Sequence, residues 1–376
     1  MTPIKINDII YLIRANITTY KETDVATLVE QAKTIICNGV RTGQYPIQSQ
    51  LPSVEDLAVT ASCSTETMRR ALTELAREGV VQRIKRYGTM VIARPSRGRV
   101  CVLASRDIHT NQMLQELVCT ALRNADVDVD MVPVSKDLVA ASDWISSLLL
   151  KRRPPEILVV LSSDGHMFTN QDLFLNILDR FPKHVLVMFD HFSSSPKVGE
   201  WHILYNHWQS AGLVMNHLRE LGHKKVACVA GNTDYEICNV YHELLEQAED
   251  LFRMAGMELI PYYHSSVIDG LVKLIKEDGV TAFWDQNDSV AFKTLIQLHQ
   301  HGIHVPQDVS IVGRFDTPWA QECHPPLTTV SMNPEGMAQA ISQAVVDALD
   351  GNQQYGYTKV SSKLVVREST GPAPVK

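Results

Sequence analysis

The pattern of hydrophobic and polar positions predicts three amphipathic helices near the start of the chain. These helices cover residues 25–41, residues 53–60 and the segment that Ser64 opens and Gly79 ends. In the third helix, Met68, Leu72 and Leu75 recur at helical spacing, while polar and basic residues occupy the other side. The second and third helices are joined by residues 61–63 only, which is typical of a helix-turn-helix.

A short hairpin is predicted directly after these helices. Residues 80–84 and residues 89–92 are predicted to be strands. The four residues between them, 85–88, have the sequence Lys-Arg-Tyr-Gly and form a basic hairpin tip. A helix-turn-helix with such a hairpin is a winged helix.

Beyond residue 99, short apolar runs alternate with amphipathic helices. The predicted strands are 100–104, 127–132, 157–161, 185–189, 226–229, 281–284 and 309–312. The predicted helices between them include 113–123, 211–221 and 289–301. Continuous apolar strands separated by helices indicate parallel sheets covered on both faces. About 275 residues are too many for one such sheet, so we predict two doubly wound lobes with a cleft between them.

The sequence therefore predicts an α/β protein in which an N-terminal winged helix-turn-helix precedes a two-lobed domain. A stretch rich in proline, serine, glycine and arginine separates the two parts. The predicted segments are an N-terminal extension, helical by its isoleucine spacing (1–24), the winged helix (25–93), a linker (94–98) and the two-lobed domain (99–376).

Composition narrows the class of protein. The chain has 376 residues, of which 45% are hydrophobic, and a mean hydropathy of -0.07, as expected of a soluble globular protein. No apolar run approaches the roughly 20 residues of a membrane span. The seven cysteines are scattered without a CxxC motif, which predicts a reduced, cytoplasmic protein.

The charge is divided between the two parts. The whole chain carries a formal charge of -7, but residues 1–97 hold 13 Lys and Arg against 9 Asp and Glu, a net +4. Nine basic residues lie within residues 69–99. A small basic module on an acidic body is typical of a DNA-binding head on a sensor domain. A solvated charged surface without a partner is the alternative.

The motifs of the predicted winged helix occur in a familiar order. Leu51-Pro52-Ser53 is followed by the segment 64–72 and then by the glycine-containing segments 78–81 and 88–91. Together they resemble the GntR-type winged helix. The resemblance implies that the second helix of the pair enters the major groove of duplex DNA and that the wing tip reaches the minor groove. The DNA-binding residues it implies are Ser53, Ser64, Thr65, Thr67, Arg69, Arg70, Lys85, Arg86, Tyr87 and Gly88.

This head departs from the usual family pattern. Many members have arginine where this chain has Glu55 and Thr65, and Arg86 replaces the first wing glycine. Glu66 adds a carboxylate, which phosphate repels unless it accepts a hydrogen bond from a cytosine amino group or pairs with Arg70. The operator sequence of other members therefore does not carry over. A winged helix that binds protein instead of DNA is the alternative.

Four segments of the second part resemble the LacI/GalR-type effector domain, which has the periplasmic-binding-protein fold. They are residues 217–227, 305–313, 325–330 and 366–370. A GntR-type head on such a body is the arrangement of arabinose-repressor-like regulators. The resemblance implies a homodimeric repressor that binds a pseudo-palindromic operator and is switched by a small molecule between the lobes. The ligand-binding residues predicted from it are Ser105, Arg106, Asp190, Tyr235, Tyr241, Trp284, Asn287, Phe315 and Asp316.

The expected ligand site also departs from its family. Phe315 replaces the first of two consecutive aspartates, and Tyr241 replaces an arginine. The aromatic side chains offer faces for sugar rings or flat heterocycles, and we rank a carbohydrate or derivative first. Alternatively, the aromatic residues are core residues, and Asp288 and Asp316 are helix caps. The chain has no GxxxxGK[ST], GxSxG or HExxH motif, and we expect no enzyme, cofactor or metal site.

Overall fold

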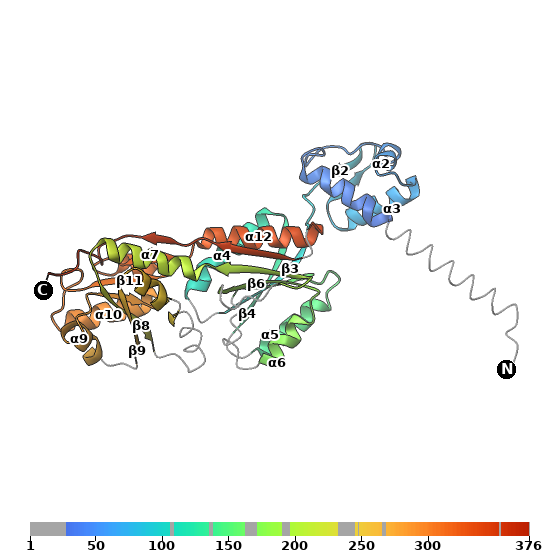
Figure 1. Ribbon diagram of the computed structural model, residues 1–376. Coiled ribbons are helices and arrows are strands. Elements are labelled where there is room, and N and C mark those ends of the chain that lie inside the picture. Colours follow the sequence, from blue (N-terminus) through green and yellow to red (C-terminus); the bar gives the residue numbers. More distant parts are fainter. Residues whose placement is uncertain are drawn as a thin grey trace, which may run out of the picture. The chain divides into compact units, whose positions relative to one another are not determined.

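The computed structural model describes residues 28–105, 109–134, 138–161, 171–189, 196–231, 245–246, 248–264, 268–352 and 355–375. The chain divides into two compact units, Met1–Ser96 and Arg97–Lys376 (Figure 1). We call them the head and the body. The predicted N-terminal extension, 1–24, lies outside the described residues.

The head contains a helix at residues 28–41, helices α2 (Val54–Thr60) and α3 (Thr65–Arg77), and an antiparallel hairpin. The hairpin strands are β1 (Val81–Ile84) and β2 (Gly88–Val91). The helices α2 and α3 begin where serine side chains cap them: Ser53 accepts from the Asp56 N–H at 3.1 Å, and Ser64 accepts from the Thr67 N–H at 3.0 Å. The predicted helix-turn-helix and wing are confirmed.

Lys33 ties the first helix of the head to the end of α3. Its ammonium group lies 3.1, 3.2 and 2.9 Å from carboxylate oxygens of Glu30, Glu74 and Glu78. Burial opposes the charge, but hydrogen bonds to Glu78 and Glu30 outweigh it and raise the Lys33 pKa above its ordinary value. The three-helix core under this cluster includes Ile36, which is fully buried.

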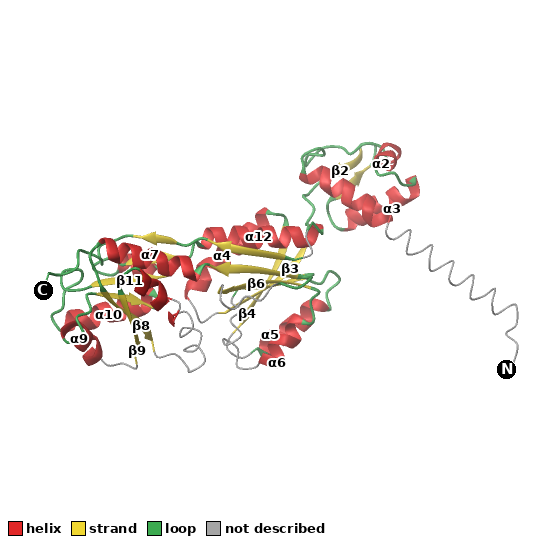
Figure 2. Ribbon diagram, viewed as in Figure 1, coloured by secondary structure: helices red, strands yellow, loops and turns green. Residues whose placement is uncertain are grey.

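The first lobe of the body is a six-stranded parallel sheet (Figure 2). Its strands, in spatial order, are β13 (Gly356–Val360), β7 (Glu200–Tyr205), β6 (Lys183–Phe189), β5 (Ile157–Val160), β3 (Gly98–Ser105) and β4 (Val127–Val134). Its helices are α4 (His109–Asn124), α5 (Val139–Leu149), α6 (Gln171–Leu178) and α12 (Pro334–Asp350). Continuous burial along β5 explains why the sequence shows its strands as unbroken apolar runs.

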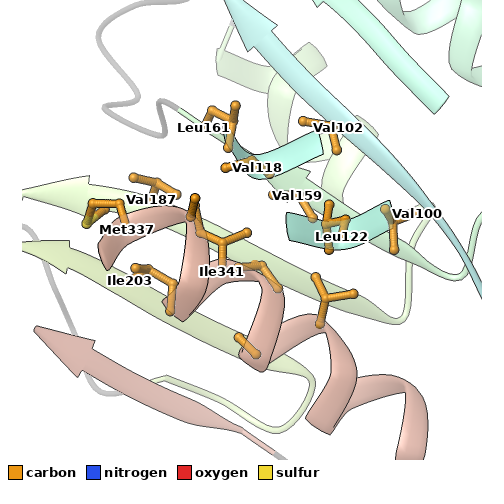
Figure 3. Packing of buried hydrophobic residues seen from close by; sticks show 14 of the residues in the cluster. Val100, Val102, Val118, Leu122, Val159, Leu161, Val187, Ile203, Met337 and Ile341 are labelled. Atoms are coloured by element: carbon orange, nitrogen blue, oxygen red, sulfur yellow. The ribbon is translucent and has the colours of Figure 1, made fainter. Parts of the chain in front are cut away.

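Each face of this sheet has its own hydrophobic core. On one face, Met337 and Ile341 of α12 pack with Val187 and Ile203 of the sheet, and α4 packs beside them (Figure 3). On the other face, α5 and α6 cover a second cluster. The first lobe is therefore doubly wound, as predicted.

The second lobe is also six-stranded, and all its neighbouring strands are parallel except β14 beside β12. The strands, in spatial order, are β14 (Lys363–Val365), β12 (Thr328–Ser331), β11 (Ser310–Arg314), β10 (Ala282–Asp285), β8 (Lys225–Gly231) and β9 (Glu258–His264). Its helices are α7 (His207–Glu220), a helix within residues 245–254, α9 (Ile268–Lys276), α10 (Asp288–Gln300) and α11 (Pro318–Glu322). Two clusters fill its two faces.

The chain crosses between the two sheets three times: from β7 to α7, from β12 to α12 and from β13 to β14. The first lobe is consequently completed by α12 and β13, which follow most of the second lobe in sequence. All seven predicted strands are present, and the described part of the body contains five further strands that were not predicted. The predicted α/β fold, a winged helix followed by two doubly wound lobes, is confirmed. Within the described ranges, no helix is long and apolar enough to cross a bilayer.

Candidate functional site

One face of α3 is exposed and polar. Glu66, Arg69, Arg70 and Thr73 follow the i, i+3, i+4, i+7 spacing of a single helix face, and all four are exposed. The opposite face packs into the head core through Met68, Ala71, Leu72 and Leu75. The exposed face carries two of the predicted groove-facing residues, Arg69 and Arg70, with half-buried Thr65 at its start.

Thr67 does not lie on this face, contrary to the sequence prediction. Its side chain is only 7% exposed, and its hydroxyl lies 2.8 Å from the Ser64 hydroxyl. The same pair makes the N-terminal cap of α3, because the Thr67 N–H also donates to Ser64. The capping turn therefore directs Thr67 inward. Ser53 caps α2 in a similar way, with its hydroxyl donating to the Asp56 carboxylate at 2.6 Å.

Both arginines on the exposed face of α3, Arg69 and Arg70, are paired with carboxylates. Arg69 lies 3.7 Å from Glu55 and 3.8 Å from Glu66, and Arg70 lies 3.6 Å from Glu66. The pairing of Glu66 with Arg70, one of two possibilities that the sequence left open, is thus present in the head. All four side chains are about half exposed or more, and exposed ion pairs contribute only about 0–1 kcal/mol. These pairs can open when another partner approaches.

The wing tip presents the predicted basic residues to solvent. Lys85, Arg86, Tyr87 and Gly88 are all exposed, and the Tyr87 N–H donates to the Ile84 carbonyl at 3.0 Å to close the turn. Arg86 has a φ of 74°, in the left-handed region that favours glycine. The turn geometry accounts for the glycine that the GntR-type pattern has at this position. Here an arginine accepts that conformation and adds a positive charge at the tip.

Of the nine ligand-binding residues predicted from the sequence, four lie outside the described residues: Arg106, Asp190, Tyr235 and Tyr241. Ser105 is the last residue of β3, and its side chain is likewise outside the description. The structure places the other four, Trp284, Asn287, Phe315 and Asp316, at the carboxyl ends of β10 and β11.

Trp284 is a core residue. It is 1% exposed, and its ring stacks between Phe252 and His207 with centroid distances of 6.3 Å to each. The Arg314 guanidinium lies over the same ring, 5.3 Å from its centroid. Trp284 thus packs in the core of the second lobe, as the alternative interpretation of the aromatic residues holds, and a ligand contact at Trp284 stays a prediction.

The Asn287–Asp288 pair has a structural role. Asn287 caps α10, because its side-chain oxygen accepts from the Val290 N–H at 2.9 Å. Asp288 is fully buried and accepts three hydrogen bonds, from the Thr317 N–H at 2.7 Å, the Thr317 hydroxyl at 2.9 Å and the Thr329 hydroxyl at 2.6 Å. Burial raises the Asp288 pKa to about 6, against the effect of these donors. Asp288 thus joins α10 to the turn after β11 and to β12.

The turn that Asp288 holds contains Phe315 and Asp316. Both have positive φ, 93° and 53°, which is strained for residues with side chains. Asp316 accepts from Arg367 at 2.6 Å, and Arg367 also donates to the Leu327 carbonyl at 2.8 Å. Asp316 is therefore not a helix cap, and its carboxylate already has a cationic partner.

Phe315 lines a small apolar pocket with residues from both lobes. Its volume is about 40 Å³, space for a few water molecules. The lining residues are Met113, Leu114, Tyr205, Phe315, Thr317, Pro318, Met332 and Pro334. The sequence predicted Phe315 but not Tyr205 or Met332. Tyr205 is the last residue of β7 and Met332 follows β12, and neither strand was predicted. Their position after a strand would have been the signal.

Asp285 is a second buried acid near these residues. It is 0% exposed, and within the described part of the chain neither carboxylate oxygen has a hydrogen-bond partner. Burial raises its pKa to about 8, and the negative charge of Asp288 acts in the same direction. Among the described residues, no cluster of three His, Cys, Asp or Glu side chains is arranged to hold a metal ion.

Comparisons with known protein families match both units. Bacterial regulatory proteins of the gntR family match residues 28–91, and the periplasmic binding protein-like domain matches residues 215–370. The head therefore matches the gntR family of regulatory proteins, and the body matches the periplasmic binding protein-like domain.

Individual relatives are similar to part of the chain. The HTH-type transcriptional repressor CytR of Escherichia coli (strain K12) is 26% identical over 200 residues, which are 50% of this chain and 57% of CytR. The chain thus spans little more than half of that relative. The HTH-type transcriptional repressor PurR of Photobacterium profundum is 25% identical over 258 residues, 65% of this chain and 73% of PurR.

Solved structures of LacI-type proteins share the fold. A LacI transcriptional regulator from a Rhodococcus species has a TM-score of 0.59 at 22% identity, covering 74% of this chain and all of that one. A dimeric Lac repressor with a C-terminal deletion has a TM-score of 0.58 at 20% identity, with coverages of 74% and 100%. A LacI family regulator from Enterococcus faecium with bound ribose has a TM-score of 0.56 at 17% identity, with the same coverages.

Proposed function

We propose that this protein is a ligand-responsive transcriptional repressor, which binds operator DNA through its head and a small molecule through its body. The observation that carries the DNA-binding part is the combination of an exposed face on α3, with Arg69 and Arg70, and a wing tip with Lys85 and Arg86. CytR and PurR are named as HTH-type transcriptional repressors, which supports regulation over catalysis. A repressor of bacterial genes acts in the cytoplasm.

The working unit we propose is a homodimer on a pseudo-palindromic operator, since one winged helix contacts too little DNA for strong selectivity. An apolar surface on the body supports pairing. Ile296 of α10 and Trp319 of α11 are 38% and 41% exposed, and the Trp319 ring contacts Phe292 with a centroid distance of 5.1 Å. The Lac repressor structure described above is also named as dimeric.

Arg69→Ala and Arg86→Ala are expected to weaken DNA binding in different ways. Arg69→Ala should cost about 1–3 kcal/mol on the preferred sequence if Arg69 contacts a base edge. Arg86→Ala should weaken binding to all duplexes alike. The slope of log affinity against log salt concentration should fall by about 1, as expected for the loss of one phosphate contact. Fluorescence anisotropy of labelled duplexes over a range of salt concentrations measures both effects.

Arg219→Ala is a suitable control for these variants, because Arg219 is an exposed arginine of the body that contacts Asn216. It should bind DNA like the wild type. Sedimentation of the same samples reports whether the bound protein is a dimer. Wild-type binding by both head variants would show that the groove assignment is wrong, and binding that is insensitive to salt would favour a head that recognises protein.

We propose that the effector binds between the lobes beside Phe315, and that the lobes move apart to admit it, because the pocket there has space for only a few water molecules. A carbohydrate or derivative remains the first class to test, because Phe315 and Tyr205 offer aromatic faces and a regulator of the same fold holds ribose. Asp316 is less suited to clamp free hydroxyls than the sequence indicated, since Arg367 already occupies its carboxylate. A ligand that prefers one arrangement of the lobes would change DNA affinity, with a typical coupling of about 1–3 kcal/mol.

A thermal-shift screen of sugars, sugar acids, nucleosides and amino acids should give a hit that stabilises the wild type. Phe315→Leu removes the aromatic face but keeps apolar volume. Because one aromatic contact with the ligand is lost, the ligand-induced shift in melting temperature should fall by more than half. Tyr357→Leu changes an exposed aromatic residue of β13 and serves as the control. An equal shift in all three proteins would place the effector elsewhere, and an unchanged DNA affinity would exclude the switch.

A further inference from the structure

The exposed face of α3 carries an acid, Glu66, although a helix face that binds DNA is expected to be positively charged. The inference drawn from it rests on the proposed DNA-binding function. Glu66 is the second residue of α3, and its side chain is 66% exposed on the same face as Arg69 and Arg70. Together with Glu55 of α2, this face holds two acids and two arginines, so its formal charge is zero.

Two features favour the Glu66 carboxylate at the front of the helix. The N-terminal turn of a helix stabilises negative charge, and Glu66 lies in that turn directly after the Ser64 cap. Arg69 and Arg70 lie 3.8 and 3.6 Å from its carboxylate. Because these contacts are long and solvent-exposed, a duplex that offers the arginines guanine or phosphate and offers Glu66 a donor can replace them.

The choice of donor follows from the chemistry of the major groove. A carboxylate only accepts hydrogen bonds, and the groove offers it the amino groups of cytosine and adenine. Adenine places the acceptor N7 beside its amino group, which repels a carboxylate, whereas cytosine presents its N4 amino group without a neighbouring acceptor. We propose that Glu66 is a specificity-determining residue that selects cytosine, while the arginine released from it binds guanine or phosphate.

Selection of duplexes from a randomised pool by the full-length protein tests this role. The wild type should enrich cytosine at one position of each half-site. Glu66→Ala should lose that preference and bind the enriched duplex about tenfold more weakly, the size of one lost base contact. Glu66→Gln should shift the preference at that position to adenine, because a glutamine amide pairs with adenine N6 and N7.

Glu55→Gln is the matched control. It removes the same charge and the other carboxylate partner of Arg69, but from α2. This variant should keep the cytosine preference. If Glu55→Gln erases that preference in the same way, the selection depends on Arg69 alone and Glu66 reads no base.

Two further outcomes separate this inference from the proposed function. If the Glu66 variants enrich the same sequences as the wild type, or bind every duplex more tightly by the same factor, Glu66 only repels DNA and the inference is overturned while DNA binding stands. If the wild type enriches no sequence and binds no duplex at low salt, the proposed function itself fails. Unchanged thermal melting of each variant shows that the exposed substitutions leave the fold intact.

Discussion

Replacing Asp288 by alanine is expected to lower the free energy of unfolding of the body by about 3–5 kcal/mol. The carboxylate is fully buried and accepts three hydrogen bonds, from the N–H and hydroxyl of Thr317 and from the Thr329 hydroxyl. Alanine leaves these donors without their acceptor, and each buried donor without a partner costs about 1–3 kcal/mol. The strained turn at Phe315 loses its anchor at the same time.

Urea unfolding followed by tryptophan fluorescence measures this loss in the full-length protein. All five tryptophans lie in the body, so their fluorescence reports its unfolding without a contribution from the head. Asp250→Ala is the control, because Asp250 is an exposed acid whose only described ion pair is with Arg253. It should change stability by less than about 1 kcal/mol. Equal midpoints for the two variants would mean that the Asp288 network does not hold the second lobe together.

Asp285→Asn is expected to remove most of the pH dependence of the stability of the body between pH 6.5 and 8. The folded-state pKa of Asp285 is raised to about 8 by burial, while the ordinary value is 3.8. Between these values the folded protein keeps the proton and the unfolded chain releases it. The free energy of unfolding therefore falls as pH rises, by up to about 1.4 kcal/mol per pH unit. The contribution of Asp285 to this free energy is smallest above pH 8.

The pH window separates Asp285 from the other buried groups. Asp288 has a folded-state pKa of about 6 and contributes its own slope below that pH. Burial lowers the pKa of His217 and His223 below the ordinary 6.5, so both are neutral in the folded and unfolded states across most of the window. Asparagine cannot ionise. The free energy of unfolding of the variant minus that of the wild type should therefore be about 2 kcal/mol larger at pH 8 than at pH 6.5.

Urea titrations at pH 6.5 and pH 8, again followed by tryptophan fluorescence, check this expectation. Asp250→Asn removes an exposed carboxylate and should leave the pH dependence of the wild type in place. If the free energy of unfolding changes with pH equally in Asp285→Asn and the wild type, Asp285 is ionised in the folded protein, with a partner that neutralises it.

The sequence was sufficient for those parts of the fold in which one local pattern decides the structure. Continuous apolar runs identified β5, β10 and β11, and the spacing of Met68, Leu72 and Leu75 identified the buried face of α3. The strand β12 was missed because two of its four residues are Thr328 and Thr329. Both threonines are buried through hydrogen bonds with Ser369 and Asp288, partners 41 residues away in each case. A single-sequence pattern contains no signal for such a partner.

The candidate sites show the same limit. The exposed polar face of α3 and the wing followed from periodicity and turn residues, but the inward position of Thr67 depends on the Ser64 cap. Trp284 had the position of a ligand contact after a strand, yet Phe252 and Arg314, which enclose it, come from elements 30 or more residues away in sequence. Residue type and position at a strand end predicted the region of the pocket, while tertiary contacts decided which side chains face it.

The chain crosses between the two sheets three times, and this limits the order in which the protein can fold on the ribosome. The head is complete after about its first hundred residues have emerged, whereas the first lobe lacks its α12 cover and its edge strand β13 until residue 360 has been made. Throughout that interval, Val187 and Ile203 lack the helix that buries them in the finished protein. A nascent chain released before α12 would thus present a finished winged helix attached to an open, aggregation-prone sheet. The fold of this protein therefore depends on its last fifty residues as much as on its first hundred.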